Sequence, residues 1–136
     1  MNYSPLNDLA WDLHQEAKQN GWYDTPRSAL EIHMLIVSEI AEATEEVRKG
    51  RPLAYKAAAA HEVNGESIPT SLIIPIDPAW AEQGIDKPEG EMVELVDALI
   101  RILDYCASKS FDIDSMVQMK RDYNKTRGWR HGGKKY

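Results

Sequence analysis

The apolar and polar positions recur with the period of an α-helix in four stretches of the chain, and these stretches predict the main elements. A serine–proline pair begins the first predicted helix, residues 4–20, and a threonine–proline pair begins the second, residues 25–49. A glycine directly follows each of these two helices, as is common where a helix ends. The third and fourth helices are expected at residues 91–109 and 112–127.

The segment between the second and third helices has a different composition. Residues 51–88 hold five of the seven prolines, which are incompatible with a continuous helix. We therefore predict an all-α protein, a four-helix bundle with a long irregular insertion at residues 51–86. Within this insertion, residues 58–63 and 67–74 can pair as a short hairpin on an Asn-Gly turn.

Four charged side chains on the third predicted helix lie along one narrow stripe. They are the only charged residues between positions 92 and 106, at offsets of 0, 3, 7 and 10: Glu94, Asp97, Arg101 and Asp104. At about 100° per residue they share an arc of roughly 80°. An ordinary surface helix has a polar face about as wide as its apolar face. The stripe is therefore either the only hydrated edge of a buried helix or a set of ligands.

A matching acidic stripe runs along the second predicted helix. Its members are Glu39, Glu42 and Glu46, at offsets of 0, 3 and 7, and an apolar face lies beside it. If the apolar faces of the two helices pack together, Glu39 and Glu42 converge with Glu94 and Asp97. Carboxylates this close raise each other's pKa unless a cation neutralises them. Mg²⁺, or alternatively Mn²⁺, is the hard divalent cation that oxygen ligands of this kind prefer.

The same charges also have an ordinary explanation. Acidic residues at this spacing are common on solvated helices, and we expect Glu45 and Glu46 to be solvated. Arg101 and Asp104 can form an ion pair within their own stripe, which contributes little if it is exposed. The four histidines lack paired metal-ligand spacing, so zinc is not expected. Cys106 lies within the apolar helix and is interpreted as a small core residue.

Length and charge narrow the class of protein. The 136 residues suit a single domain, residues 1–136, that ends in a basic tail at residues 128–136. From Lys120 onward, seven basic residues and one acid give +6, which leaves −12 for the remainder of a chain whose net charge is −6. An acidic body with a basic end suits metal ions at one site and phosphates at another. No apolar run reaches the length of a membrane span and no secretory signal pattern begins the chain, so we expect a cytoplasmic protein.

Glu39-x-x-Glu42 and Glu94-x-x-Asp97 together resemble the E-x-x-E…E-x-x-D signature of the MazG-like, all-α nucleoside triphosphate pyrophosphohydrolases, in particular their phage and bacterial branch. The similarity covers most of the chain outside the insertion. It extends over residues 21–24, 38–43, 87–90, 94–104, 123–127 and 131–134. About fifty residues separate Glu42 from Glu94, which is longer than the usual gap in this family. The insertion is therefore a candidate lid or specificity element.

The resemblance implies a reaction. Mg²⁺ bound by the four acids would support hydrolysis of a (deoxy)nucleoside triphosphate between the α and β phosphates. The products would be the nucleoside monophosphate and pyrophosphate. Metal ions in such sites neutralise phosphate charge and lower the pKa of an attacking water. Either Glu42 or Glu39 would accept the proton of that water.

The resemblance also implies where the substrate binds. Polar and basic residues spaced at i, i+4 and i+7 share one face of the fourth helix, and two basic residues of the tail extend it. The predicted phosphate-binding residues are Lys120, Asn124, Arg127, Arg130 and Lys134. Trp22 is the candidate for stacking on the base, with His14 as a neighbour.

Two other functions fit the sequence less well. One is a phosphoribosyl-ATP pyrophosphatase-like enzyme, which shares the fold and the metal chemistry. The other is a non-catalytic helical dimer that binds a partner or nucleic acid through its basic tail, although nucleic acid is disfavoured by the resemblance. The wide apolar arcs of the helices predict a homodimer or homotetramer, and no membrane partner is expected.

Overall fold

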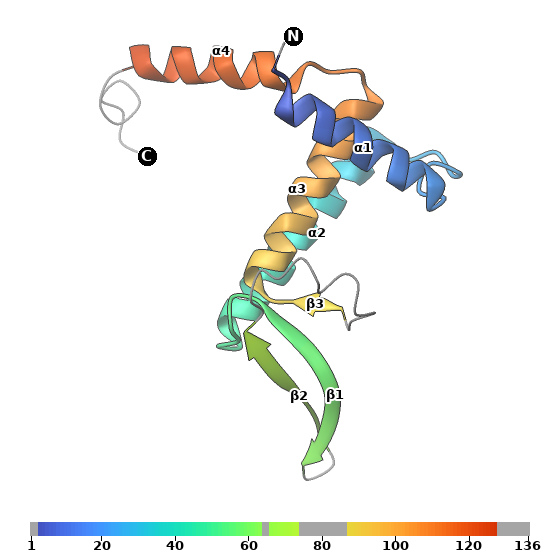
Figure 1. Ribbon diagram of the computed structural model, residues 1–136, viewed down its shortest axis with the longest axis vertical. Helices are drawn as coiled ribbons and strands as arrows, with labels where there is room; N and C mark the ends of the chain where they lie inside the picture. The colour runs from blue at the N-terminus through green and yellow to red at the C-terminus, as the bar shows by residue number, and fades with distance from the viewer. Residues whose placement is uncertain (1–2, 64–65, 74–86, 128–136) are drawn as a thin grey trace. The chain divides into compact units, whose positions relative to one another are not determined.

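The computed structural model describes residues 3–63, 66–73 and 87–127, and Figure 1 shows their elements. Within these ranges the protein is predominantly helical, with four helices and three strands. In chain order they are α1 (Pro5–Gln19), α2 (Ala29–Arg48), β1 (Tyr55–Val63), β2 (Glu66–Ile73), β3 (Pro88–Glu89), α3 (Glu91–Ser108) and α4 (Ile113–Thr126). The predicted helical character and the four predicted helices are confirmed. None of the described helices is both long enough and apolar enough to cross a membrane.

One predicted helix boundary is wrong. The Thr-Pro pair at residues 25–26 precedes α2 but does not begin it, because the helix starts at Ala29. Ser28 is the N-cap: its backbone is extended and its hydroxyl accepts a hydrogen bond from the backbone N–H of Glu31 at 3.2 Å. A serine side chain satisfies an N-terminal N–H group that the helix itself leaves without a partner, and this fixes the start of α2.

The chain divides into two compact units. Unit 1 comprises Met1–Arg27 and Ile102–Tyr136, and unit 2 comprises Ser28–Arg101. The prediction of one domain over residues 1–136 stays a prediction. In unit 1 the buried apolar residues are Ala10 and Leu103, and in unit 2 they include Ile32, Ala43 and Ala98.

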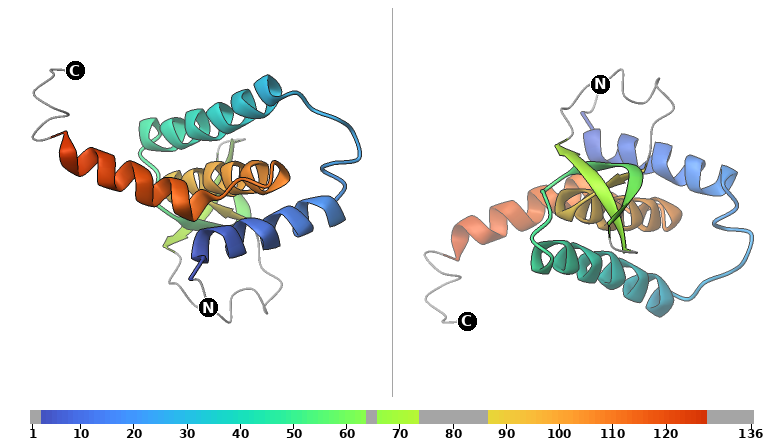
Figure 2. Two further views of the ribbon diagram at one scale, coloured as in Figure 1. Left: turned by 90° about the horizontal axis from the view of Figure 1, so that it is seen from above. Right: turned by 90° about the horizontal axis from the view of Figure 1, so that it is seen from below.

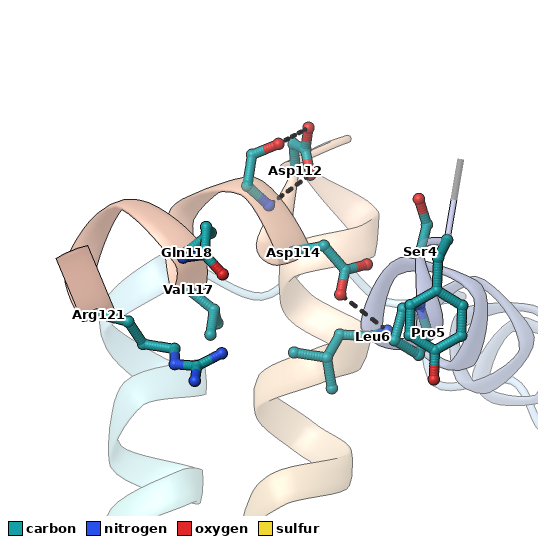
Figure 3. A pocket seen from close by; sticks show the side chains of 10 residues that line it. Ser4, Pro5, Leu6, Asp112, Asp114, Val117, Gln118 and Arg121 are labelled. Carbon is teal, nitrogen blue, oxygen red and sulfur yellow. Dashed lines mark hydrogen bonds between the residues drawn. The ribbon is translucent and has the colours of Figure 1, made fainter. Parts of the chain in front are cut away.

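In unit 1, α1 and α4 cap each other's first turns. The carboxylate of Asp114 accepts hydrogen bonds from the backbone N–H groups of Leu6, at 3.2 Å, and Asn7, at 2.9 Å. The side-chain oxygen of Asn7 accepts in return from the backbone N–H of Ile113 at 2.8 Å. Ser4 occupies the predicted N-cap position, but its hydroxyl makes no capping bond. A pocket of about 710 Å³ adjoins this junction, with Arg121 and Val117 of α4 on one side (Figure 3).

In unit 2, the residues of the insertion that the structure describes form a β-hairpin. β1 and β2 pair antiparallel from Tyr55 opposite Ile73 to Val63 opposite Glu66, with an irregularity between Ala58 and His61. β1 lies between β2 and the short β3 in a three-stranded sheet. The predicted hairpin is confirmed, and the description of these residues as irregular is wrong. The Asn-Gly turn at residues 64–65 lies outside the described residues.

A buried polar network connects the end of α2 with the start of β1. The hydroxyl of Tyr55, which is fully buried, donates to Glu46 at 3.0 Å. Arg51 donates to Glu46 and to the Tyr55 hydroxyl, each at 3.1 Å. Burial, followed by the hydrogen bond to Glu46, raises the pKa of Tyr55 to about 12. The prediction that Glu46 is solvated is therefore wrong. Glu45 is exposed, as predicted, and pairs with Arg48.

Gly90 joins β3 to α3. Both its backbone conformation and the lack of space around its Cα require a glycine. Its φ is +120°, and a Cβ at this position would lie 2.5 Å from the carbonyl oxygen of Leu53 and 2.9 Å from the Cα of Ala54. The backbone N–H of Met92 donates to that same carbonyl of Leu53 at 3.0 Å. This close approach fixes the first turn of α3 against the segment that leads into β1.

We predict that Gly90→Ala lowers the free energy of unfolding by about 2 kcal/mol or more, because it adds a backbone clash to an unfavourable φ. Gly50→Ala is the matched control: Gly50 also has a positive φ, of +66°, but its Cβ would meet nothing within 4 Å. We expect the control to cost only about 1 kcal/mol. Urea unfolding of both variants measures the difference, and equal losses would contradict the close-approach explanation.

Candidate metal centre

Three carboxylates from α2 and α3 converge in unit 2. Glu39, Glu94 and Asp97 each offer an oxygen, and these oxygens lie within 4.8 Å of one another. Glu39 and Glu94 are only 8% and 9% exposed. Glu94 and Asp97 are one helical turn apart and therefore share a face of α3, opposite Glu39 on the neighbouring α2 (Figures 1 and 2). Within the described residues, the predicted convergence is present for these three acids.

Glu42, the fourth predicted ligand, contacts this group through Glu94. A side-chain hydrogen bond joins the two residues. Two carboxyl groups can hydrogen-bond only when one of them carries a proton, so this contact contributes to the raised pKa of Glu94. Glu42 is exposed, in contrast to Glu39 one turn earlier on α2. Its position gives the group a side that faces solvent.

Burial and repulsion together change the acidity of the cluster. The pKa of Glu94 is raised to about 7, first by burial, then by the hydrogen bond to Glu42 and by the negative charges of Glu42, Asp97 and Glu39. The pKa of Asp97 is also raised, mainly by burial and by Glu39, and against the opposing effect of Lys87 and Arg101. Repulsion between negative charges contributes to both shifts, and a nearby cation would relieve this repulsion.

The other two charged residues of the α3 stripe, Arg101 and Asp104, contact residues of different units. In unit 2, Nε and Nη2 of Arg101 each lie 2.9 Å from Oε1 of Glu39. In unit 1, Oδ1 of Asp104 lies 2.8 Å from Nδ1 of His14 and accepts a hydrogen bond from the Tyr23 hydroxyl, also at 2.8 Å. Arg101 and Asp104, which were predicted to form an ion pair within the stripe, thus each contact a residue of another element.

The donor set suits a hard divalent cation. The three converging groups are all carboxylates, which are the ligands that Mg²⁺ and Mn²⁺ prefer, and no histidine or cysteine belongs to the group. The group is small enough for one ion to contact all three oxygens. The raised pKa of Glu94 is a further sign of fit, because a bound divalent cation would offset the repulsion that contributes to this shift.

The predicted phosphate-binding residues lie partly in the described chain. Lys120 and Asn124 are exposed on α4, and Arg127 is the C-cap of that helix. The side chains of Lys120 and Arg127 approach the ring of Tyr123 at 5.3 and 5.6 Å. All of these residues belong to unit 1. Arg130 and Lys134 lie outside the described residues.

The two residues proposed for base binding have other contacts. The guanidinium of Arg27 lies 3.8 Å from the centre of the Trp22 ring, and it also donates to the carbonyl oxygen of Trp22. One face of the indole is therefore covered by Arg27. His14 is only slightly exposed, and its ring packs edge-on against Tyr23 at 4.7 Å. Both side chains stabilise unit 1 in this structure, and their role in base binding stays a prediction.

Some partners of the site were not predicted. The contact between Arg101 and Glu39 was recognisable in principle, because Arg101 lies one turn beyond Asp97 in the same stripe. The contacts of Asp104 with His14 and Tyr23 join residues 90 and 81 positions apart, and no local spacing indicates them.

Comparisons of the chain with protein-family models, curated proteins and solved structures give no match.

The raised pKa of Glu94 predicts how the stability of the metal-free protein depends on pH. Between pH 4.5 and about 7 the folded protein retains a proton that the unfolded chain loses, so stability decreases as pH rises through this window. Glu94→Gln should flatten this dependence and make the protein more stable than wild type at about pH 8, by about 1–3 kcal/mol.

Chemical denaturation in the presence of a chelator, repeated across this pH range, measures the effect. Glu45→Gln is the control, because Glu45 is exposed and paired only with an exposed arginine. The control should keep the wild-type dependence on pH. Parallel pH curves for Glu94→Gln and wild type would contradict the assignment of the titrating proton to Glu94.

Proposed function

We propose that this protein hydrolyses a (deoxy)nucleoside triphosphate between the α and β phosphates and releases the nucleoside monophosphate and pyrophosphate. The observation that carries this proposal is the convergence of Glu39, Glu94 and Asp97 within 4.8 Å. The E-x-x-E…E-x-x-D resemblance supports the same reaction, because these residues are three of its four acids. The fourth, Glu42, contacts the group through Glu94.

We assign Glu39, Glu94, Asp97 and Glu42 to holding Mg²⁺, with Mn²⁺ as the alternative ion. When bound, such an ion neutralises phosphate charge and lowers the pKa of a water molecule. The protein itself positions the ligands. Two helices hold the carboxylates in place before the substrate arrives, which avoids reorganisation during the reaction. The buried position of Glu39 and Glu94 limits the water that competes for these ligands.

The proton of the attacking water needs an acceptor, and we assign this role to Glu42. It is exposed, so water reaches it, and it contacts the buried acids through its hydrogen bond to Glu94. Glu39 is less suited, because Arg101 already lies against its carboxylate. An acceptor must be within hydrogen-bond reach of the water it deprotonates, and the acid on the exposed side of the group meets this requirement best.

Binding of the triphosphate is assigned to the basic face of α4. Lys120 and Arg127 carry charge there, and Asn124 adds an amide between them. Both cations contact the ring of Tyr123. Arginine binds phosphate through a planar fork and lysine as a point charge, so the pair can contact different phosphate oxygens.

A panel of ribonucleoside and deoxyribonucleoside triphosphates with Mg²⁺ tests the proposal, with pyrophosphate and nucleoside monophosphate both quantified. Glu94→Gln and Asp97→Asn should each lower kcat/KM by about 100-fold or more, because each removes a charged ligand. The control Glu45→Gln should retain wild-type activity. Release of phosphate instead of pyrophosphate would overturn the assigned bond, and no turnover of any substrate would overturn the proposal.

Two alternatives predict different results in the same assay. A phosphoribosyl-ATP pyrophosphatase-like enzyme would release pyrophosphate from phosphoribosyl-ATP and not from the ordinary nucleotides. A non-catalytic helical dimer that acts through its basic tail would keep its partner binding in Glu94→Gln and Asp97→Asn. The convergence of buried acids favours the enzyme over the binding module, because binding through the tail gives no reason to bury these charges.

We further propose that the protein is a homodimer or homotetramer. Exposed apolar side chains at helical spacing line one face of α2, at Leu30, Met34 and Val37, which are 75%, 62% and 52% exposed. A similar row on α3 includes Leu95 and Leu99. Apolar rows of this length usually lie in interfaces, and a second copy of the chain would cover them.

We expect Met34→Glu to shift the protein toward the monomer, because it places a charge in the middle of the α2 row. Gln19→Glu, which adds the same charge at an exposed polar position, should leave the assembly unchanged. Light scattering at micromolar concentration measures the mass of each variant. A wild-type protein that is monomeric at this concentration would contradict the proposed assembly.

A further inference from the structure

Arg101 lies against one of the converging carboxylates, and its contact is well defined. Its Nε and Nη2 atoms both approach Oε1 of Glu39 at 2.9 Å. The side chains of the pair are only 27% and 11% exposed. An arginine held by two charge-assisted contacts in a partly buried position interacts much more strongly than an exposed surface pair.

The contact supplies positive charge to a group of acids that has too little of it. Glu39, Glu94 and Asp97 lie within 4.8 Å of one another, and Lys87 acts on Asp97 through space. Glu39 has Arg101. The group therefore receives positive charge in two ways: through space from an exposed lysine, and by direct contact from a partly buried guanidinium. Only the guanidinium is in direct contact with its carboxylate through a side chain of fixed geometry.

We propose that Arg101 is a built-in competitor of the divalent cation, and that it has to leave Oε1 of Glu39 before Glu39 can act as a metal ligand. This inference rests on the proposed function, because it assumes that the group binds a metal. Arg101 lies one turn beyond Asp97 on α3, so it can withdraw along its own helix without a change in the backbone.

The competition has a consequence for regulation of the site. A cation that binds must replace an existing ion pair, so the affinity for free metal is lower than four carboxylates would otherwise give. A polyphosphate that binds nearby would offer the displaced guanidinium an anionic group to contact. Metal and nucleotide therefore favour each other's binding, and this coupling is reciprocal. Arg101 acts here as a positioning residue that sets metal affinity and does not itself react.

Titration with Mn²⁺ tests the inference, with free Mn²⁺ followed by electron paramagnetic resonance. Arg101→Gln should bind Mn²⁺ about tenfold more tightly than wild type, because the competing contact is gone. Lys87→Gln is the matched control: it also removes one positive charge that acts on the cluster, but from an exposed position. We expect a change of about threefold or less in this control, which disappears at high salt.

A second readout follows Arg101 directly in the wild-type protein. The Nε–H resonance of Arg101, assigned by its loss in Arg101→Lys, should shift on addition of Mg²⁺ as its hydrogen bond to Glu39 breaks. Circular dichroism establishes that each variant is folded. A purely structural role for Arg101 would leave this resonance unmoved by Mg²⁺.

The outcomes separate the two proposals. Equal or weaker Mn²⁺ binding by folded Arg101→Gln, beside normal binding by wild type, would overturn the competition and leave the proposed function intact. Failure of both folded proteins to bind Mn²⁺ would overturn the proposed function and the competition together. If Arg101→Gln does not fold, Arg101→Lys replaces it. This variant keeps the charge but loses the planar fork, so intermediate affinity supports the competition and unchanged affinity overturns it.

Discussion

Repulsion among the carboxylates of α2 and α3 is the constraint on which the rest of unit 2 depends. Glu39, Glu94 and Asp97 lie close enough to share one ion, and burial strengthens every interaction among their charges. Without other forces the two helices would separate or the acids would turn outward. The proton on Glu94 and the guanidinium of Arg101 relieve part of this repulsion locally. The remaining part has to be offset by packing and hydrogen bonds elsewhere.

Contacts near the ends of α2 and α3 stabilise the two helices against this repulsion. Gly90 lets the backbone of α3 approach the Leu53 carbonyl, so the first turn of the helix, which carries Glu94, is fixed to the segment before β1. At the other end of this segment, Tyr55 and Arg51 hold the last turn of α2 through Glu46. Both helices are thus attached to the same short stretch of chain, and the relative position of their acids follows from these attachments.

Much of this arrangement was predictable from local sequence, and the rest depends on contacts that spacing does not encode. Periodicity located the helices to within a few residues, and the two acidic motifs indicated the converging residues. The pattern around Glu46 looked identical to that of a solvated glutamate, because its partner Tyr55 belongs to a strand. Capping of α1 by Asp114 joins residues more than a hundred positions apart, whereas Ser4 of the local serine–proline pair makes no capping bond. Long-range partners of polar groups are therefore what sequence reasoning missed.

The same repulsion explains why a functional role is favoured over a structural one for these acids. Replacing buried charges by apolar residues of similar size is often neutral or stabilising, so a fold has no need of such a cluster for its own stability. Active sites commonly retain groups that destabilise the free protein and are relieved when a ligand binds. Here a divalent cation would relieve both the proton on Glu94 and the pairing of Glu39 with Arg101. We therefore propose this group as a site for a divalent cation, with Arg101 as the proposed competitor of that ion.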